Sequence, residues 1–282
     1  MVRNVFAMLS LVTGMMASAA ITHAATTTTP DAPDIVMIGD SQAQGVGGAL
    51  QRLYMRKKEF HVIDKTKVGT GLTSRSTYDW EAVVGQLQVV DRPTVAIVMF
   101  GANDRPPVRI KGLVDPNLSE KFAKSYSARV ANIVQSLRKA KMDVVWLGDP
   151  VVENADYLAD MDFLNKVMEP VAETGGAKWV SLWDITGGDA GTYAAYGKAL
   201  DGQTKRLRAD DGVHFTPTGY DLVAARLDPI LKDLTGGKAM PAQPTATAPA
   251  AAAPATGGPA TAVKSAIDAP QANPSANVAV TQ

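Results

Sequence analysis

The chain has 282 residues, no cysteine, and equal numbers of basic and acidic side chains, 28 Lys+Arg against 28 Asp+Glu. The absence of a basic excess argues against a nucleic-acid partner. Without cysteine the protein has no disulfides, so its core must stabilise it. Residues 33–236 are predicted to form one domain between two segments of different composition.

The N-terminal segment has the pattern of a secretory signal peptide. Arg3 precedes an apolar run from about Val5 to Ala20, and small residues stand at the cleavage-site positions of Thr22-His23-Ala24. The alternative is an uncleaved membrane anchor, but the apolar run is shorter than the roughly 20 residues that a span needs. We therefore expect residues 1–24 to be removed, residues 25–32 to be a linker, and the protein to be periplasmic or secreted.

Short apolar segments then alternate with longer segments of helical periodicity. The predicted strands are residues 34–39, 61–68, 94–100, 143–147 and 178–182. The near-continuous apolar run 94–100 is typical of a central parallel strand buried on both faces. Helices are predicted directly after Ser41, between the third and fourth strands, between the fourth and fifth, and from Thr216 onward with Pro217 in the first turn. The alternation predicts an α/β fold, a three-layer α/β/α domain with a mainly parallel five-stranded sheet.

Residues with chemical potential follow several of these strands. Ser41 comes after the first strand, Gly69 and Gly71 after the second, Asn103 after the third and Asp149 after the fourth. Parallel strands bring their carboxyl ends to one edge of the sheet, where open α/β folds bind ligands. These residues are therefore expected to gather at one site.

Ser41 is the candidate nucleophile, and a serine hydroxyl needs a base to take its proton. Of the three histidines, His23 lies in the predicted signal peptide, and His61 opens a strand far from any acidic motif. His214 remains, three residues after Asp211, a spacing that lets the carboxylate reach back to the imidazole. The alternative for this segment is a helix start with acidic capping and a surface histidine.

An acyl-transfer enzyme also needs hydrogen-bond donors for the developing oxyanion. The candidates are the backbone N–H groups of Ser41 and Gly71 and the side-chain amide of Asn103. Gly69, two residues before Gly71, remains an alternative donor. The alternative for Asn103 is a turn residue, because Asn-Asp is common in turns, and Gly71 could equally be a turn glycine.

Four segments resemble the four blocks of the SGNH (GDSL-like) hydrolase superfamily, in the same order. They are Gly39-Asp40-Ser41, the glycine of Val68-Gly69-Thr70-Gly71, Gly101-Ala102-Asn103-Asp104 and Asp211-Gly212-Val213-His214. Together the blocks cover essentially the whole predicted domain. The chain is most similar to an uncharacterised, exported bacterial branch of that superfamily.

The resemblance implies a flavodoxin-like α/β/α fold and an acyl-enzyme mechanism without cofactor. It implies Ser41 as nucleophile, with Asp211 and His214 as the remaining catalytic pair. It also implies that Ser41, Gly71 and Asn103 form the oxyanion hole. Members of the superfamily include esterases, lipases, thioesterases, carbohydrate deacetylases and O-acetyltransferase domains.

The segment departs from the family pattern at one position, because many members have leucine where this chain has Gln42. The departure weakens any inference toward lipase activity. The expected function is an exported serine esterase acting on O-acyl, chiefly acetyl, groups of an envelope or secreted polysaccharide, or on a small ester. The alternatives are an O-acyltransferase using the same residues and a non-catalytic protein that binds a glycan or a partner.

Other features allow two readings. Arg105 could contact a sugar or an anion, or could pair with Asp40 or Asp104. Tyr78 and Trp80 could stack on a sugar, or could pack in the core. No segment has the spacing of a metal site.

Residues 237–282 are rich in Ala, Pro and Thr. This composition predicts a disordered tail, which could tether the domain to a polysaccharide-synthesis assembly.

Overall fold

The computed structural model describes residues 32–73, 76–90, 93–106, 109–110, 113–186 and 191–236. The predicted signal peptide, most of the predicted linker and the predicted tail lie outside these residues. The predicted domain limits therefore stay predictions. No helix in the described part of the chain is long and apolar enough to cross a membrane.

The central feature is a parallel sheet with the strand order β2-β1-β3-β6-β7. Its strands are β1 (Asp34–Gly39), β2 (His61–Thr66), β3 (Val95–Met99), β6 (Asp143–Leu147) and β7 (Ala177–Val180). The helices are α1 (Ser41–Lys57), α2 (Trp80–Val90), α3 (Pro116–Lys139), α4 (Ala155–Thr174) and α5 (Pro217–Gly236). Two antiparallel pairs lie outside the sheet, β4 (Arg109–Ile110) with β5 (Leu113–Val114) and β8 (Tyr196–Lys198) with β9 (Thr204–Arg206).

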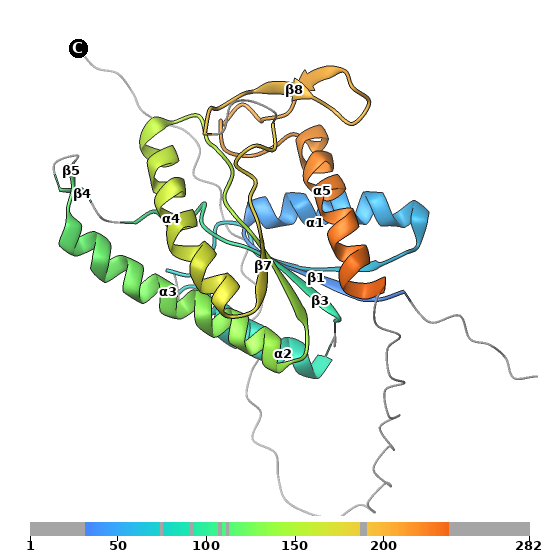
Figure 1. Cartoon of the computed structure of the whole chain (residues 1–282), viewed down its shortest axis with the longest axis horizontal. Helices are drawn as coiled ribbons and strands as arrows, with labels where there is room; N and C mark the ends of the chain where they lie inside the picture. Colours follow the sequence, from blue (N-terminus) through green and yellow to red (C-terminus); the bar gives the residue numbers. More distant parts are fainter. Residues whose placement is uncertain are drawn as a thin grey trace, which may run out of the picture. The chain divides into compact units, whose positions relative to one another are not determined.

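The helices cover both faces of the sheet (Figure 1). α1 and α5 lie on one face, and α2, α3 and α4 lie on the other. Ile35 and Met37 of β1 pack toward α1 and α5, whereas Val36 and Ile38 pack toward the other layer, and all four side chains are fully buried. This alternation is the pattern of a strand buried on both faces. The predicted three-layer α/β/α fold with a parallel five-stranded sheet is confirmed.

The turn from β1 into α1 determines where Ser41 lies. Gly39 has a φ of +144°, and a Cβ there would lie 2.0 Å from the carbonyl oxygen of Met99, so only glycine fits. Asp40 then caps α1, because its carboxylate accepts a hydrogen bond of 2.9 Å from the backbone N–H of Gln42. Ser41 is the first residue of the helix, at the positive end of its dipole.

The sheet register brings the ends of three strands level. Gly39 of β1 pairs with Met99 of β3 on one side and with Thr66 of β2 on the other. The chain segments that follow these strands therefore begin at the same edge of the sheet. The four sequence blocks that resemble the SGNH pattern all contribute to this part of the structure.

Candidate active site

Ser41 and His214 are in direct contact at the carboxyl edge of the sheet. The Ser41 Oγ lies 2.8 Å from the His214 Nε2, although the two residues are 173 positions apart in the chain. His214 belongs to the loop that leads into α5, and α5 packs beside α1 on the same face of the sheet (Figure 1). The structure therefore places these two predicted site residues side by side.

Asp211 holds His214 from the other side of the ring. Its Oδ2 lies 2.6 Å from the His214 Nδ1, and its Oδ1 accepts hydrogen bonds of 2.8 and 2.9 Å from the backbone N–H groups of Val213 and His214. Gly212 permits this tight loop with a φ of +66°. Partial burial raises the pKa of Asp211, but these hydrogen bonds and the nearby imidazole outweigh that effect, so the pKa is lowered. The carboxylate therefore stays ionised at neutral pH.

Asn103 points into the network that joins three of the blocks. Its side-chain nitrogen lies 3.2 Å from the Asp40 Oδ2 and 3.0 Å from the carbonyl oxygen of Thr70. An amide nitrogen carries two protons, so both already have an acceptor. An oxyanion at this site would have to share one of them. By contrast, the backbone N–H groups of Ser41 and Gly71 have no hydrogen-bond acceptor among the described residues.

The two candidate glycines after β2 differ in their surroundings. Gly69 is exposed, and a Cβ built on it would meet no atom within 4 Å. Gly71 is buried, and a Cβ there would lie 2.2 Å from the Asp104 Oδ1. Gly71 also directly follows Thr70, whose carbonyl holds Asn103. The geometry therefore favours Gly71 over Gly69 as the second backbone donor, beside Ser41.

Asp104 anchors the segment that contains Gly71. Its buried carboxylate accepts hydrogen bonds from the backbone N–H groups of Leu72 (2.9 Å) and Thr73 (2.8 Å). It accepts two more from the hydroxyls of Thr73 (2.7 Å) and Tyr126 (2.9 Å). Asp104, directly after Asn103, therefore fixes the loop after β2 to the turn that follows β3.

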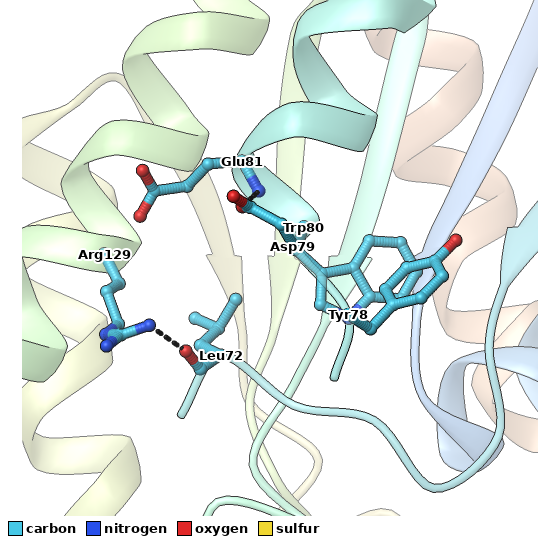
Figure 2. A pocket seen from close by; sticks show the side chains of 6 residues that line it. All are labelled: Leu72, Tyr78, Asp79, Trp80, Glu81 and Arg129. Atoms are coloured by element: carbon cyan, nitrogen blue, oxygen red, sulfur yellow. Dashed lines mark hydrogen bonds between the residues drawn. The ribbon is translucent and has the colours of Figure 1, made fainter. Parts of the chain in front are cut away.

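Arg129 of α3 holds the same loop from the outside. Figure 2 shows its guanidinium reaching the carbonyl oxygen of Leu72, to which it donates a hydrogen bond. Leu72 is thus held through both its N–H and its carbonyl group. The loop that supplies Gly71 is therefore fixed to α3 and to the turn that follows β3, which suits a rigid donor.

The aromatic pair before α2 packs in the core. Trp80 is 2 % exposed, donates from its indole nitrogen to the Thr70 Oγ1 (3.1 Å), and lies edge-on to Phe100 at 5.0 Å between ring centroids. The hollow beside Tyr78 and Trp80 in Figure 2 holds only about 10 Å³, the room of one water molecule. The structure therefore favours packing over sugar stacking for this pair.

Three buried carboxyl groups surround the site, those of Asp40, Asp104 and Asp149. Burial raises the pKa of Asp40 to about 6, a rise that Asp104 increases and that hydrogen bonds from the start of α1 oppose. Burial, with the charges of Asp40 and Asp104, also raises the pKa of Asp149 well above its usual range. The Asp149 Oδ2 has no hydrogen-bond partner among the described residues.

The raised pKa of Asp40 predicts a pH-dependent stability. The folded state binds this proton more tightly than the unfolded state, so the contribution of Asp40 is fully present below about pH 4 and is lost as the pH rises through 6. The shift of about 2 units corresponds to about 3 kcal/mol. We expect the free energy of unfolding of Asp40→Asn to rise by about that amount relative to the wild type between about pH 4 and pH 7.

Urea denaturation at a series of pH values measures this difference. Asp64→Asn is the matched control, because Asp64 is exposed and, among the described residues, accepts hydrogen bonds only from Thr66 two residues on. Its curve gives the effect of the same substitution at an exposed carboxyl. A parallel curve for Asp40→Asn would show that the buried carboxyl does not titrate in this range.

Gln42, noted from the sequence only as a departure, joins the nucleophile segment to the His214 loop. Its side-chain nitrogen donates to the carbonyl oxygen of Val213 (2.7 Å), and its side-chain oxygen accepts from the Tyr220 hydroxyl (3.0 Å). The side chain is 1 % exposed. A leucine could make neither hydrogen bond, so Gln42 has a positioning role in this chain.

Arg208 supports the same loop and was missed by sequence reasoning. It is 1 % exposed, donates to the carbonyl oxygens of Val151 (2.6 Å) and Val213 (2.5 Å), and lies 4.2 Å from the centre of the Phe215 ring. No carboxylate among the described residues pairs with it. Burial lowers its pKa to about 10, which leaves it charged at neutral pH. In the sequence it stands among other basic residues and resembles a surface charge.

Two further predictions are decided by the contacts. Arg105 pairs with Asp160 at 2.8 Å and lies over the Tyr157 ring, so neither Asp40 nor Asp104 is its partner. The reason is that the chain after Asn103 turns toward α4, where Asp160 is buried.

His61 pairs with the exposed Asp34 at the amino end of the sheet, far from the site. Within the described ranges, no three acidic, histidine or cysteine residues are grouped to hold a metal ion.

Comparisons with known proteins give one family and a set of solved structures. A model of the family described as "Protein of unknown function (DUF459)" matches residues 34–229. No curated protein matches the chain. A GDSL-like lipase from Bacteroides thetaiotaomicron is 17 % identical with a TM-score of 0.48, over 71 % of this chain and 88 % of that one.

Two esterases are similar to the same extent. The psychrotrophic esterase EstA from Pseudoalteromonas is 15 % identical with a TM-score of 0.47, over 71 % of this chain and 97 % of that one. A catalytic mutant of the acetylxylan esterase Axe2 from Geobacillus stearothermophilus is 17 % identical with a TM-score of 0.47, over 72 % and 94 %.

Proposed function

The chain belongs to the DUF459 family of unknown function, and within that family we propose that it is a serine ester hydrolase. The observation that carries the proposal is the continuous contact from Ser41 through His214 to Asp211, with distances of 2.8 and 2.6 Å. In this order the imidazole can take the proton of the hydroxyl, and the carboxylate can orient the imidazole and stabilise its positive charge. The position of Ser41 at the start of α1 adds a positive dipole end beside the reacting atoms.

In the first half of the reaction, the Ser41 Oγ attacks the ester carbonyl carbon while its proton passes to the His214 Nε2. Asp211 keeps the imidazole in the right tautomer and stabilises its positive charge. The carbonyl oxygen becomes an oxyanion, for which the backbone N–H groups of Ser41 and Gly71 supply donors. Asn103 contributes by sharing one of the protons that it now directs to Asp40 and Thr70.

The tetrahedral intermediate then breaks its bond to the alcohol oxygen. His214 returns its proton to that oxygen, the alcohol leaves, and the acyl group stays on Ser41. In the second half, water gives a proton to His214 and attacks the acyl carbon. When the bond from that carbon to the Ser41 Oγ breaks, the proton passes from His214 to the Oγ, and the acid is released. The atoms balance without any cofactor or metal.

The proposed substrate is an O-acyl, chiefly acetyl, group on an envelope or secreted polysaccharide. It is supported by the predicted signal peptide, which would place the enzyme where such polymers occur. We also propose that residues 237–282 tether the domain to a polysaccharide-synthesis assembly. Sequencing the N-terminus of the exported protein tests the predicted signal peptide, because cleavage after Ala24 leaves Ala25 as the first residue.

Acetate release from an O-acetylated polysaccharide tests the function. With acetyl groups carrying a radiolabel and an unlabelled acceptor polymer present, we expect the label as free acetate. His214→Ala should lower this release by about 10³-fold or more, because the serine loses its base. Label on the acceptor polymer would instead indicate acyl transfer, and binding without loss of label would indicate a non-catalytic protein.

A further inference from the structure

An open groove leads away from Ser41 along one side of α1. Gly48 and Arg52 of α1 line it on one side, and His214, Phe215 and Pro217 line it on the other. Its volume is about 590 Å³, within the range of small-molecule binding sites. From Ser41 to Arg52 the helix rises eleven residues, or about 16 Å at 1.5 Å per residue. The groove is therefore much longer than an acetyl group.

The position of His214 indicates which part of an ester would occupy this groove. His214 protonates the departing alcohol oxygen, so the alcohol must leave on the side of the imidazole. The groove contains His214 and the residues that follow it, whereas Asn103 and Gly71, on the oxyanion side, do not line it. We propose that the groove binds the alcohol portion of the substrate, an extended, hydroxyl-rich chain such as an oligosaccharide.

This inference rests on the proposed ester hydrolysis and specifies its substrate. When the bond between the carbonyl carbon and the alcohol oxygen breaks, the acyl group stays on Ser41 and the protonated alcohol leaves through the groove. A long groove on this side selects esters with a large alcohol. The small acyl group needs no comparable space.

The far end of the groove has the chemistry to recognise hydroxyl groups. Arg52 lines the groove and pairs at 2.7 Å with Asp221 of α5, which lines the neighbouring hollow, and the two side chains remain 47 % and 43 % exposed. The pair therefore presents unused donors and acceptors to solvent at the groove end. Sugar hydroxyls both donate and accept hydrogen bonds, so they match such a pair better than an alkyl chain does.

Gly48 provides a way to block the groove without disturbing the fold. A Cβ built on it meets no atom closer than 3.7 Å, the Arg52 Nη1, so a side chain can extend from this position. Gly45 does not allow this, because its Cβ would lie 2.1 Å from the Tyr220 ring. Replacing glycine inside a helix also gains about 0.5 kcal/mol in propensity. Gly48→Trp should therefore fold and fill the groove about 10 Å from Ser41.

The experiment compares two acetate esters with the full chain, methyl acetate and acetylated cellohexaose. Gly48→Trp is expected to lower the ratio of kcat/KM for the hexasaccharide to kcat/KM for methyl acetate by about 30-fold, mainly through KM. The loss is selective because only the large alcohol extends to Gly48.

Gly85→Trp is the matched control. Gly85 lies in α2 on the opposite face of the sheet, and a Cβ there also meets open space. Its ratio should equal that of the wild type. An unchanged ratio in Gly48→Trp, including an equal loss on both esters, would overturn the groove assignment. Failure of the wild type to hydrolyse either ester would overturn the proposed function itself.

Discussion

Replacing Ser41 by alanine is expected to lower kcat for ester hydrolysis by about 10⁵- to 10⁶-fold. The reason is that no other described hydroxyl contacts the His214 Nε2, so the pair loses its nucleophile. The fold should be nearly unaffected. Alanine is the best helix former, and the loss of one partly buried hydrogen bond costs about 1 kcal/mol.

Initial rates on methyl acetate and covalent labelling with a fluorophosphonate measure this effect. The wild type should gain the label on the peptide that contains Ser41, and Ser41→Ala should gain none. Ser125→Ala is the control, because the exposed Ser125 hydroxyl donates to the carbonyl of Phe122 and to no other atom in the described part of the chain. Retention of turnover in Ser41→Ala, or labelling at another serine, would show that the nucleophile is elsewhere.

Replacing Asp104 by alanine is expected to have the largest effect on stability, a loss of about 3–5 kcal/mol in the free energy of unfolding. The carboxylate is fully buried and accepts four hydrogen bonds, so its removal leaves the Tyr126 hydroxyl and the N–H groups of Leu72 and Thr73 without an acceptor. An unpaired buried donor costs about 1–3 kcal/mol.

Urea denaturation measures this loss as a lower midpoint at an unchanged slope. Asp104→Asn keeps one acceptor oxygen and should lose less unfolding free energy than the alanine variant. It therefore still tests the prediction if Asp104→Ala does not fold. Asp115→Ala, at the exposed N-cap of α3, gives the cost of an ordinary capping aspartate, about 1 kcal/mol. If Asp104→Ala lost no more than Asp115→Ala, the buried carboxylate would not be the anchor of the loop.

The sequence allowed the layout of the sheet to be predicted because its central strands are short apolar runs. β1 and β6 have the predicted limits, whereas β2 ends at Thr66 and β7 begins one residue early, at Ala177. The β8–β9 hairpin was not predicted. Its strands have three residues each, and most of their side chains are exposed, so they carry no apolar periodicity.

The contacts of Ser41, Asp211 and His214 could be predicted because their chemistry depends on their own side chains. The roles of Gln42 and Arg208 could not, because both act on the backbone carbonyl of Val213. A carbonyl group is present at every position, so no residue type signals that it will be an acceptor. The contact also requires the loop geometry, which the sequence pattern does not specify.

The distance along the chain between Ser41 and His214 has a consequence for biosynthesis. At about 5–20 residues per second, His214 is synthesised about 10–35 s after Ser41, because 173 residues separate them. Until the last helix has been made and has packed beside the first, the serine has no base. A nascent or truncated chain is therefore expected to carry an inert serine, and the proposed ester cleavage is expected to begin only with the finished domain.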